Sequence, residues 1–147
     1  MTVMASMSIL VVEDFNSMVR IIRSLLKQIG FENVDEAADG SAALAKMRQK
    51  KYQLVISDWN MAPMTGHEFL KLLRADEALA QTPFVMVTAE SSVEHVIEAK
   101  RAGVDSFLIK PFNAQNLKAK IDEALARRNL GQPAGWQRAP PFDTRLN

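Results

Sequence analysis

Short runs of apolar residues alternate along the chain with longer stretches in which apolar residues recur every three or four positions. A short continuous apolar run is typical of a buried strand, and the three-to-four-residue recurrence is typical of a helix with one apolar face. The pattern predicts five strands, over residues 8–12, 34–37, 53–57, 84–87 and 104–109. It predicts a helix after each strand, with apolar positions over 18–29, 42–47, 69–73, 93–101 and 117–125.

The strict alternation of strands and helices predicts one α/β domain built on a parallel sheet. Parallel neighbours need right-handed crossovers, which place helices on both faces of the sheet. We expect five strands in the flavodoxin-like order 2-1-3-4-5, with five helices, within residues 7–128. Residues 1–7 lack the pattern of a signal peptide and are expected to be a loose leader. Residues 129–147 are rich in Gly and Pro, and we expect them to form an extended or flexible tail.

Composition narrows the functional classes. The 147 residues include no cysteine, which excludes disulfides and thiol catalysis and fits a cytoplasmic protein. No apolar run approaches the roughly 20 residues of a membrane span. The net charge of +1 gives no case for DNA or membrane binding by the chain as a whole. The charge is uneven, however, because residues 127–147 hold four arginines and one aspartate, which suggests that this end meets an anion.

Polar and charged residues stand where the predicted strands end. Glu13 and Asp14 follow the first strand, Asp58 the third, Thr88 the fourth and Lys110 the fifth. Open parallel sheets bind ligands at the carboxyl ends of their strands, so we expect these side chains to share one site. Converging carboxylates need a counter-charge, which a bound Mg²⁺ or a lysine supplies. An aspartate in such surroundings is suited to accept a phosphoryl group, because this transfer depends on positioning and charge neutralisation.

Four segments in this register resemble the response-regulator receiver family, and their spacing is most similar to the chemotaxis regulators of the CheY type. They are Leu10–Phe15 (LVVEDF), Val55–Met61 (VISDWNM), Val87–Ala89 (VTA) and Lys110–Phe112 (KPF). The resemblance runs from about residue 7 to residue 128. It implies a single-domain regulator that a histidine kinase phosphorylates and that is not an enzyme.

The resemblance also implies a role for each residue of the site. Asp58 would be the phosphoacceptor, and Thr88 and Lys110 would contact the phosphoryl group. Mg²⁺ would be held by Glu13, Asp14, Asp58 and the backbone carbonyl of Asn60. The Lys110–Pro111 peptide would be cis. Taken singly, these residues have plainer interpretations, Asp58 as a turn residue and Glu13-Asp14 as a solvated pair; the register of all four segments favours the site.

Two departures from the family pattern bear on the switch. In this chain the proline after the acceptor loop comes one place late, in Met61-Ala62-Pro63, so we expect a differently shaped loop. Phe107 stands where the chemotaxis regulators have the tyrosine that moves inward on activation. Two interpretations stay open for it: a switch residue coupled to Thr88, or simply a buried ring. We interpret Trp59 as a partly buried aromatic residue, and His67 and His95 as surface residues of helices.

The arginines near the C-terminus suggest a nucleotide. Guanidinium groups grip phosphates, and an exposed Trp stacks on bases. The candidates are Arg127, Arg128, Gly131, Trp136 and Arg138. They resemble the Arg-rich tails of receivers that bind cyclic di-GMP and act on the flagellar motor. The alternatives are a tail that binds a protein and a tail with no role.

Two functional hypotheses follow. In the first, phosphorylation of Asp58 repacks the face around Phe107, and a component of the flagellar motor or another protein then binds. In the second, cyclic di-GMP binds the tail and controls the motor, and phosphorylation is secondary. An enzyme of the aspartyl-phosphate type is disfavoured, because no substrate-binding insert or second catalytic domain is visible.

Overall fold

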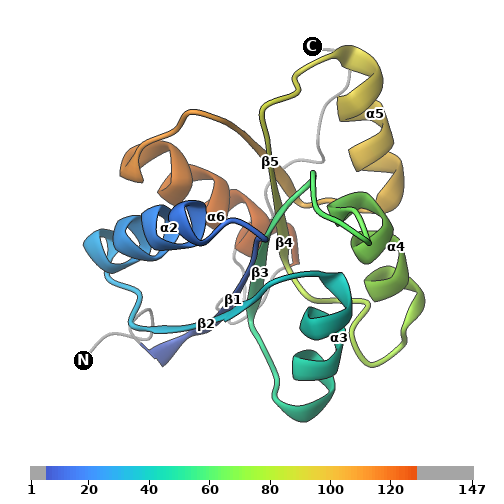
Figure 1. The fold of residues 1–147 in the computed structure, drawn as a ribbon, viewed down its shortest axis with the longest axis horizontal. Coiled ribbons are helices and arrows are strands. Elements are labelled where there is room, and N and C mark those ends of the chain that lie inside the picture. Colours follow the sequence, from blue (N-terminus) through green and yellow to red (C-terminus); the bar gives the residue numbers. More distant parts are fainter. Residues whose placement is uncertain (1–5, 129–147) are drawn as a thin grey trace.

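The computed structural model describes residues 6–128 and contains one parallel sheet of five strands, in the order β2-β1-β3-β4-β5 (Figure 1). The strands are β1 (Ser8–Val12), β2 (Asn33–Ala37), β3 (Leu54–Asp58), β4 (Phe84–Thr88) and β5 (Ser106–Ile109). The helices are α2 (Asn16–Ile29), α3 (Gly40–Gln49), α4 (Gly66–Ala75), α5 (Val93–Ala102) and α6 (Ala114–Arg128). The predicted topology is confirmed. The fifth strand is shorter than predicted, because Val104 and Asp105 precede the ladder.

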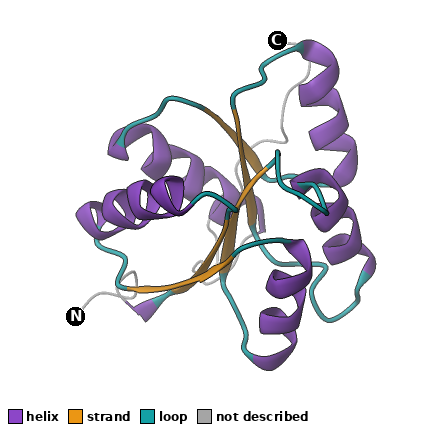
Figure 2. Cartoon of the chain, viewed as in Figure 1, coloured by secondary structure: helices purple, strands orange, loops and turns teal. Residues whose placement is uncertain are grey.

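The sheet is covered on both faces, as the crossover rule requires. One face packs against α2 and α6, and the other packs against α3, α4 and α5 (Figure 2). Alternate residues of a strand point to opposite faces, so Ile9 and Val11 join the first core and Leu10 and Val12 the second. All four side chains are fully buried, which explains the uninterrupted apolar run in the sequence.

Short-range signals set where the helices on the second face begin. The Asp39 carboxylate accepts a hydrogen bond from the Ala42 N–H at the start of α3. Thr65 and Glu68 form a reciprocal capping box at the start of α4, and the Ser92 hydroxyl caps α5. At the other end of α5, Gly103 adopts φ +99°, a left-handed conformation that favours glycine.

The carboxyl ends of β1, β3, β4 and β5 lie at one edge of the sheet. In the ladder Asp58 pairs with Val87, and Thr88 pairs with Ile109. Glu13 follows β1, and Lys110 follows β5 directly. The fold therefore brings together residues that stand far apart in the sequence. No helix between residues 6 and 128 has both the length and the apolar character needed to cross a bilayer.

Candidate functional site

Asp58 is the centre of the site. It is the last residue of β3, only 3% exposed, and its Oδ1 atom lies 2.7 Å from Nζ of Lys110. The backbone supports this placement: the Lys110 N–H donates to the Thr88 carbonyl, and the Trp59 N–H donates to the Val87 carbonyl. The predicted approach of Asp58 and Lys110 is therefore present, and Thr88 ends β4, the strand between β3 and β5. The Lys110–Pro111 peptide is cis, as the resemblance implied.

Burial dominates the electrostatics of the two inner carboxylates. Burial raises the pKa of Asp58, and the Lys110 ammonium opposes this shift. Burial also raises the pKa of Glu13 to about 7, and repulsion from Asp58 adds to it. Repulsion between the two buried carboxyl groups is thus opposed by the charge of one lysine, Lys110. A further positive charge would relieve this repulsion.

The donor set at this edge suits a divalent cation with oxygen ligands. Glu13 is 2% exposed, and its buried Oε1 atom has no hydrogen-bond partner among the described residues. Asp14, the next residue, and Asn60, two residues after Asp58, are both exposed, whereas Asp58 is buried. Within residues 6–128 no three acidic or histidine side chains form a metal cluster by themselves. Mg²⁺ is commonly held by one or two carboxylates together with waters, so the residues present fit this ion.

Thr88 connects the acceptor to the neighbouring helix. Its side chain is 1% exposed at the end of β4, and its Oγ1 atom accepts a hydrogen bond from the Glu90 N–H at 3.0 Å. The same oxygen lies 3.2 Å from Nε2 of His95 in α5. Phe107 is 6% exposed, so the ring is buried in this structure. Its ring meets that of His95 edge to face, with centroids 5.9 Å apart.

The expectation that His67 and His95 are surface residues of helices is confirmed only in part: both lie on helices, but neither is fully exposed. Both are only partly exposed, and both contact the indole of Trp59, which is 8% exposed. The centroid of the Trp59 ring lies 5.1 Å from that of His67 and 3.5 Å from that of His95. Helical periodicity alone missed this cluster, because the rings come from two different helices and a strand-end loop.

Gly66 fixes the position of the acceptor loop. Its N–H donates to the Trp59 carbonyl at 2.7 Å, and a Cβ atom placed on Gly66 would lie 2.1 Å from the carbonyl oxygen of Asp58. Only a residue without a side chain allows this approach of two backbones. The Ala62–Pro63 peptide in the loop between them is cis.

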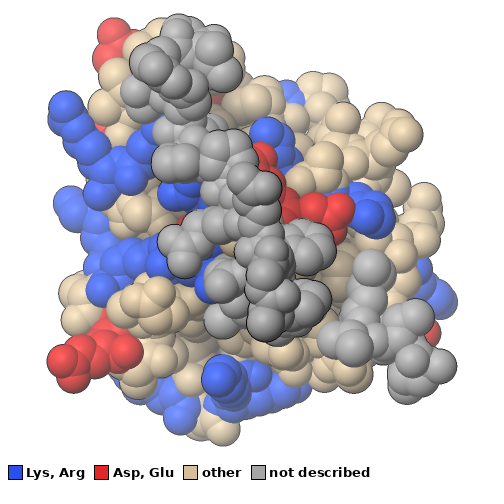
Figure 3. All heavy atoms as spheres, turned by 180° about the vertical axis from the view of Figure 1, so that it is seen from behind, with Lys and Arg blue, Asp and Glu red and all other residues tan. Residues whose placement is uncertain are grey.

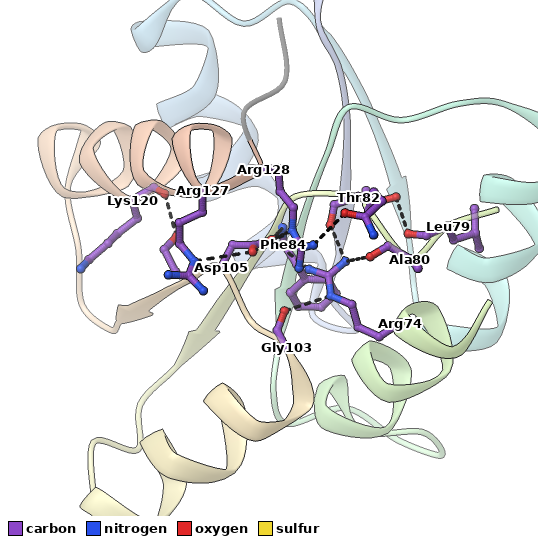
Figure 4. A network of polar contacts seen from close by, with 12 residues as sticks. Arg74, Leu79, Ala80, Thr82, Phe84, Gly103, Asp105, Lys120, Arg127 and Arg128 are labelled. Atoms are coloured by element: carbon purple, nitrogen blue, oxygen red, sulfur yellow. Dashed lines mark hydrogen bonds and ion pairs between the residues drawn. The ribbon is translucent and has the colours of Figure 1, made fainter. Parts of the chain in front are cut away.

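The two arginines assigned to the tail lie in the last turn of α6. Nε of Arg128 is 2.9 Å from Oδ1 of Asp105, and Nε of Arg127 is 3.7 Å from the same atom. Figure 4 shows both side chains reaching toward Asp105, which precedes β5 at the amino edge of the sheet. Gly131, Trp136 and Arg138 lie outside the described residues, as does the predicted 129–147 tail.

A third arginine completes this cluster, which sequence analysis missed. Arg74 of α4 lies 2.8 Å from Asp105 and also donates to the carbonyls of Gly103, Ala80 and Thr82. Burial lowers the pKa of Arg74 to about 10, and the Asp105 carboxylate opposes the shift. The guanidinium groups of Arg74, Arg127 and Arg128 therefore share one buried carboxylate, that of Asp105.

Basic side chains also gather over α4 and α5 on the face seen from behind (Figure 3).

The amino-acid sequence is similar to those of known proteins. The family model described as the response regulator receiver domain covers residues 9–122. The chemotaxis protein CheY of Pseudomonas aeruginosa is 46% identical over 123 residues, 84% of this chain and 99% of that protein. CheY-3 of Vibrio cholerae is 45% identical over 122 residues, 83% of this chain and 94% of that protein.

A solved structure agrees with both. The chemotaxis response regulator CheY4 of Vibrio cholerae superposes with a TM-score of 0.75 at 37% identity, covering 82% of this chain and all of that one. This chain belongs to the response regulator receiver family. It is a CheY-like receiver domain, of the kind found in two-component chemotaxis signalling.

Proposed function

We propose that this protein is a single-domain response regulator that accepts a phosphoryl group on Asp58 in a Mg²⁺-dependent reaction. The observation that carries the proposal is the buried Asp58 carboxylate beside Lys110, with Thr88 at the end of the next strand and Glu13 opposite. We place the protein in the cytoplasm, with a histidine kinase as donor. Its role is that of a signalling switch, and no separate substrate is turned over.

The chain's own groups suit each part of the transfer. An oxygen of Asp58 attacks phosphorus, a P–O bond forms, and the P–N bond to the donor imidazole breaks, leaving its electron pair on that nitrogen. Mg²⁺, held by Glu13, Asp14, Asp58 and the Asn60 carbonyl, would neutralise charge on the phosphoryl oxygens. Lys110 supplies a second positive charge, and the Thr88 hydroxyl supplies a hydrogen-bond donor.

Output would follow from movement of the same groups. When the Thr88 hydroxyl turns to the phosphoryl group, the space beside β4 changes, and Phe107 on the adjacent β5 repacks. Phe107 has no hydroxyl, so it would act by packing alone. We propose that the altered face then binds a protein, with the flagellar motor switch as the candidate suggested by the chemotaxis relatives.

The proposal is tested with the full chain, Mg²⁺ and acetyl phosphate or a phosphorylated histidine kinase. The parent should gain one phosphoryl group by intact mass, and Asp58→Asn should gain none. Asp122→Asn is the matched control, because Asp122 is an exposed carboxylate on α6, bonded to Lys118. Equal labelling of the parent and Asp58→Asn would contradict the assignment.

A second candidate function, binding of cyclic di-GMP, is favoured by the arginine cluster. Arg74, Arg127 and Arg128 outnumber the one carboxylate between them, and guanidinium forks suit phosphate oxygens. We propose that Arg127 and Arg128, with Gly131, Trp136 and Arg138, contact this nucleotide. Phosphorylation would then be a second input to the same protein.

Calorimetric titration of the full chain with cyclic di-GMP tests this candidate. The proposal expects micromolar or tighter binding that is weakened by Arg128→Ala and by Trp136→Ala, while Asp58→Asn binds like the parent. An unrelated change such as Lys118→Ala is the control for lost positive charge. Absence of binding by the parent would contradict the nucleotide assignment and leave the first proposal intact.

A further inference from the structure

His95 is placed to control the Thr88 hydroxyl. Its Nε2 atom lies 3.2 Å from Oγ1 of Thr88, and its backbone N–H is held by the Ser92 cap in the first turn of α5. The ring itself is fixed from two other sides, by Trp59 at a centroid distance of 3.5 Å and by Phe107 at 5.9 Å. One side chain thus contacts the residue after the phosphoacceptor, the phosphoryl-sensing threonine and the candidate switch ring.

The Thr88 side chain can donate only a limited number of hydrogen bonds. A hydroxyl has a single hydrogen to donate. Thr88 Oγ1 already accepts from the Glu90 N–H, which fixes the position of the oxygen but leaves that hydrogen available. Burial lowers the pKa of His95, which favours a neutral ring with one unprotonated nitrogen. A neutral ring can accept the hydroxyl hydrogen, whereas the protonated ring cannot.

We propose that His95 is a positioning residue: in the unphosphorylated protein its Nε2 atom accepts the hydroxyl hydrogen of Thr88 and holds that hydrogen away from Asp58. The inference rests on the proposed function, since the hydroxyl is the donor that the phosphoryl group would take. Phosphorylation then competes with His95 for one hydrogen. Loss of the bond frees the imidazole beside Trp59 and Phe107, which links the acceptor to the α5–β5 face.

Two substitutions distinguish the effect of the His95–Thr88 hydrogen bond from the effect of the aromatic ring of His95. His95→Phe keeps an aromatic ring against Trp59 and removes the acceptor nitrogen. His95→Gln removes the ring and retains an acceptor oxygen at similar reach. All variants are made in a Trp136→Phe background, so that Trp59 is the single tryptophan of the 147-residue chain and reports on the site by its emission.

The measurement is the dissociation constant of beryllofluoride, a phosphoryl analogue, in the presence of Mg²⁺. A net hydrogen bond contributes about 0.5–1.5 kcal/mol, so His95→Phe should tighten binding by about two- to tenfold. His95→Gln should bind like the parent. In a Thr88→Val background the effect of His95→Phe should vanish, because the two residues act through one bond.

Each other outcome overturns the inference. Unchanged affinity in His95→Phe shows that the bond does not hold the hydroxyl back, and a persistent effect in Thr88→Val shows that His95 does not act through Thr88. If His95→Gln behaves like His95→Phe, the ring rather than the bond matters. A parent that neither binds beryllofluoride nor gains a phosphoryl group would instead contradict the proposed function.

A second measurement tests the inference without phosphorylation. Nitrogen NMR of the resting protein distinguishes the tautomers, and the chain has only two histidines, so His67→Gln identifies the signals of His95. The inference expects an unprotonated Nε2 and a protonated Nδ1 near pH 7. A proton on Nε2 would overturn it, whatever the result with beryllofluoride.

Discussion

The Nζ atom of Lys110 lies 2.7 Å from Oδ1 of Asp58, although Asp58 ends β3, Lys110 follows β5, and β4 lies between those two strands. The lysine therefore reaches across Thr88 to the acceptor. Its ammonium is the nearest positive charge that the described structure gives to a carboxylate only 3% exposed. We therefore predict that the Lys110 ammonium neutralises the Asp58 carboxylate in the resting protein and the phosphoryl oxygens in the phosphorylated protein.

Replacing Lys110 should therefore slow phosphorylation. Lys110→Gln removes the charge that would neutralise the phosphoryl oxygens, and loss of one such contact typically costs about a hundredfold in rate. The rate of labelling by acetyl phosphate at fixed Mg²⁺ measures the effect. Lys118→Gln, an exposed lysine on α6, should label like the parent. Equal rates for the two variants would contradict the role of Lys110.

Glu13 should make the stability of the Mg²⁺-free protein depend on pH. Its pKa is raised from about 4.5 to about 7 by burial, so between these values the folded state binds more protons than the unfolded state. Stability is therefore highest below about pH 4.5 as far as this group is concerned, and it falls by on the order of 2 kcal/mol as pH rises to about 7.

Denaturant unfolding across this pH range checks the prediction. Glu13→Gln should flatten the fall, because the variant has no proton to lose. Saturating Mg²⁺ should also oppose it, since a bound cation favours the deprotonated carboxylate, and the stabilisation by Mg²⁺ should grow with pH. A fall of equal size in the parent and in Glu13→Gln would assign the effect to another group.

Gly66→Ala should disturb the acceptor without touching any ionisable group. The new Cβ would stand 2.1 Å from the Asp58 carbonyl oxygen, and backbone on both sides cannot move aside cheaply. We expect a loss of about 1–3 kcal/mol of stability together with slower phosphorylation. Gly40→Ala is the matched control, because its nearest neighbour is the flexible thioether of Met64. Similar losses in both variants would contradict the specific role of Gly66.

Asp105→Asn should weaken the attachment of α6. The buried carboxylate accepts from Arg74, Arg128 and the Phe84 N–H, so its neutralisation leaves partly buried arginines without their counter-charge. Breaking a buried pair from one side costs about 3–5 kcal/mol, and the loss here should approach this range. Thermal unfolding measures it, with Asp122→Asn as the exposed comparison. A difference below about 0.5 kcal/mol between the two variants would contradict the prediction.

The fold was predictable because hydrophobic period and strand-end chemistry agree along this chain. Continuous apolar runs such as Ile9–Val12 identify strands buried on both faces, and the alternation with helices then leaves few topologies. The prediction that Asp58 and Lys110 lie at the same edge of the sheet followed from their positions at the carboxyl ends of parallel strands. Local signals for β5 were weaker, because Asp105 and Ser106 interrupt the apolar residues of 104–109 and Val104 lies outside the ladder.

The side-chain contacts between different helices and strands were not predictable from periodicity. His95 looks like any polar residue of an amphipathic helix, and its approach to Thr88 depends on how α5 packs beside β4. Asp105 and Arg74 likewise belong to different elements, and only the folded chain joins them. Spacing predicts which residues share a face, but it carries no information on which side chains of neighbouring elements meet.

Locating the phosphoryl group on the chain tests directly whether Asp58 is the phosphoacceptor. After incubation with acetyl phosphate and Mg²⁺, borohydride reduction converts an aspartyl phosphate to homoserine, which peptide mass spectrometry assigns to a position. We expect a single homoserine at position 58, formed from Asp58. Modification at another aspartate, or no modification of the folded parent, would contradict it.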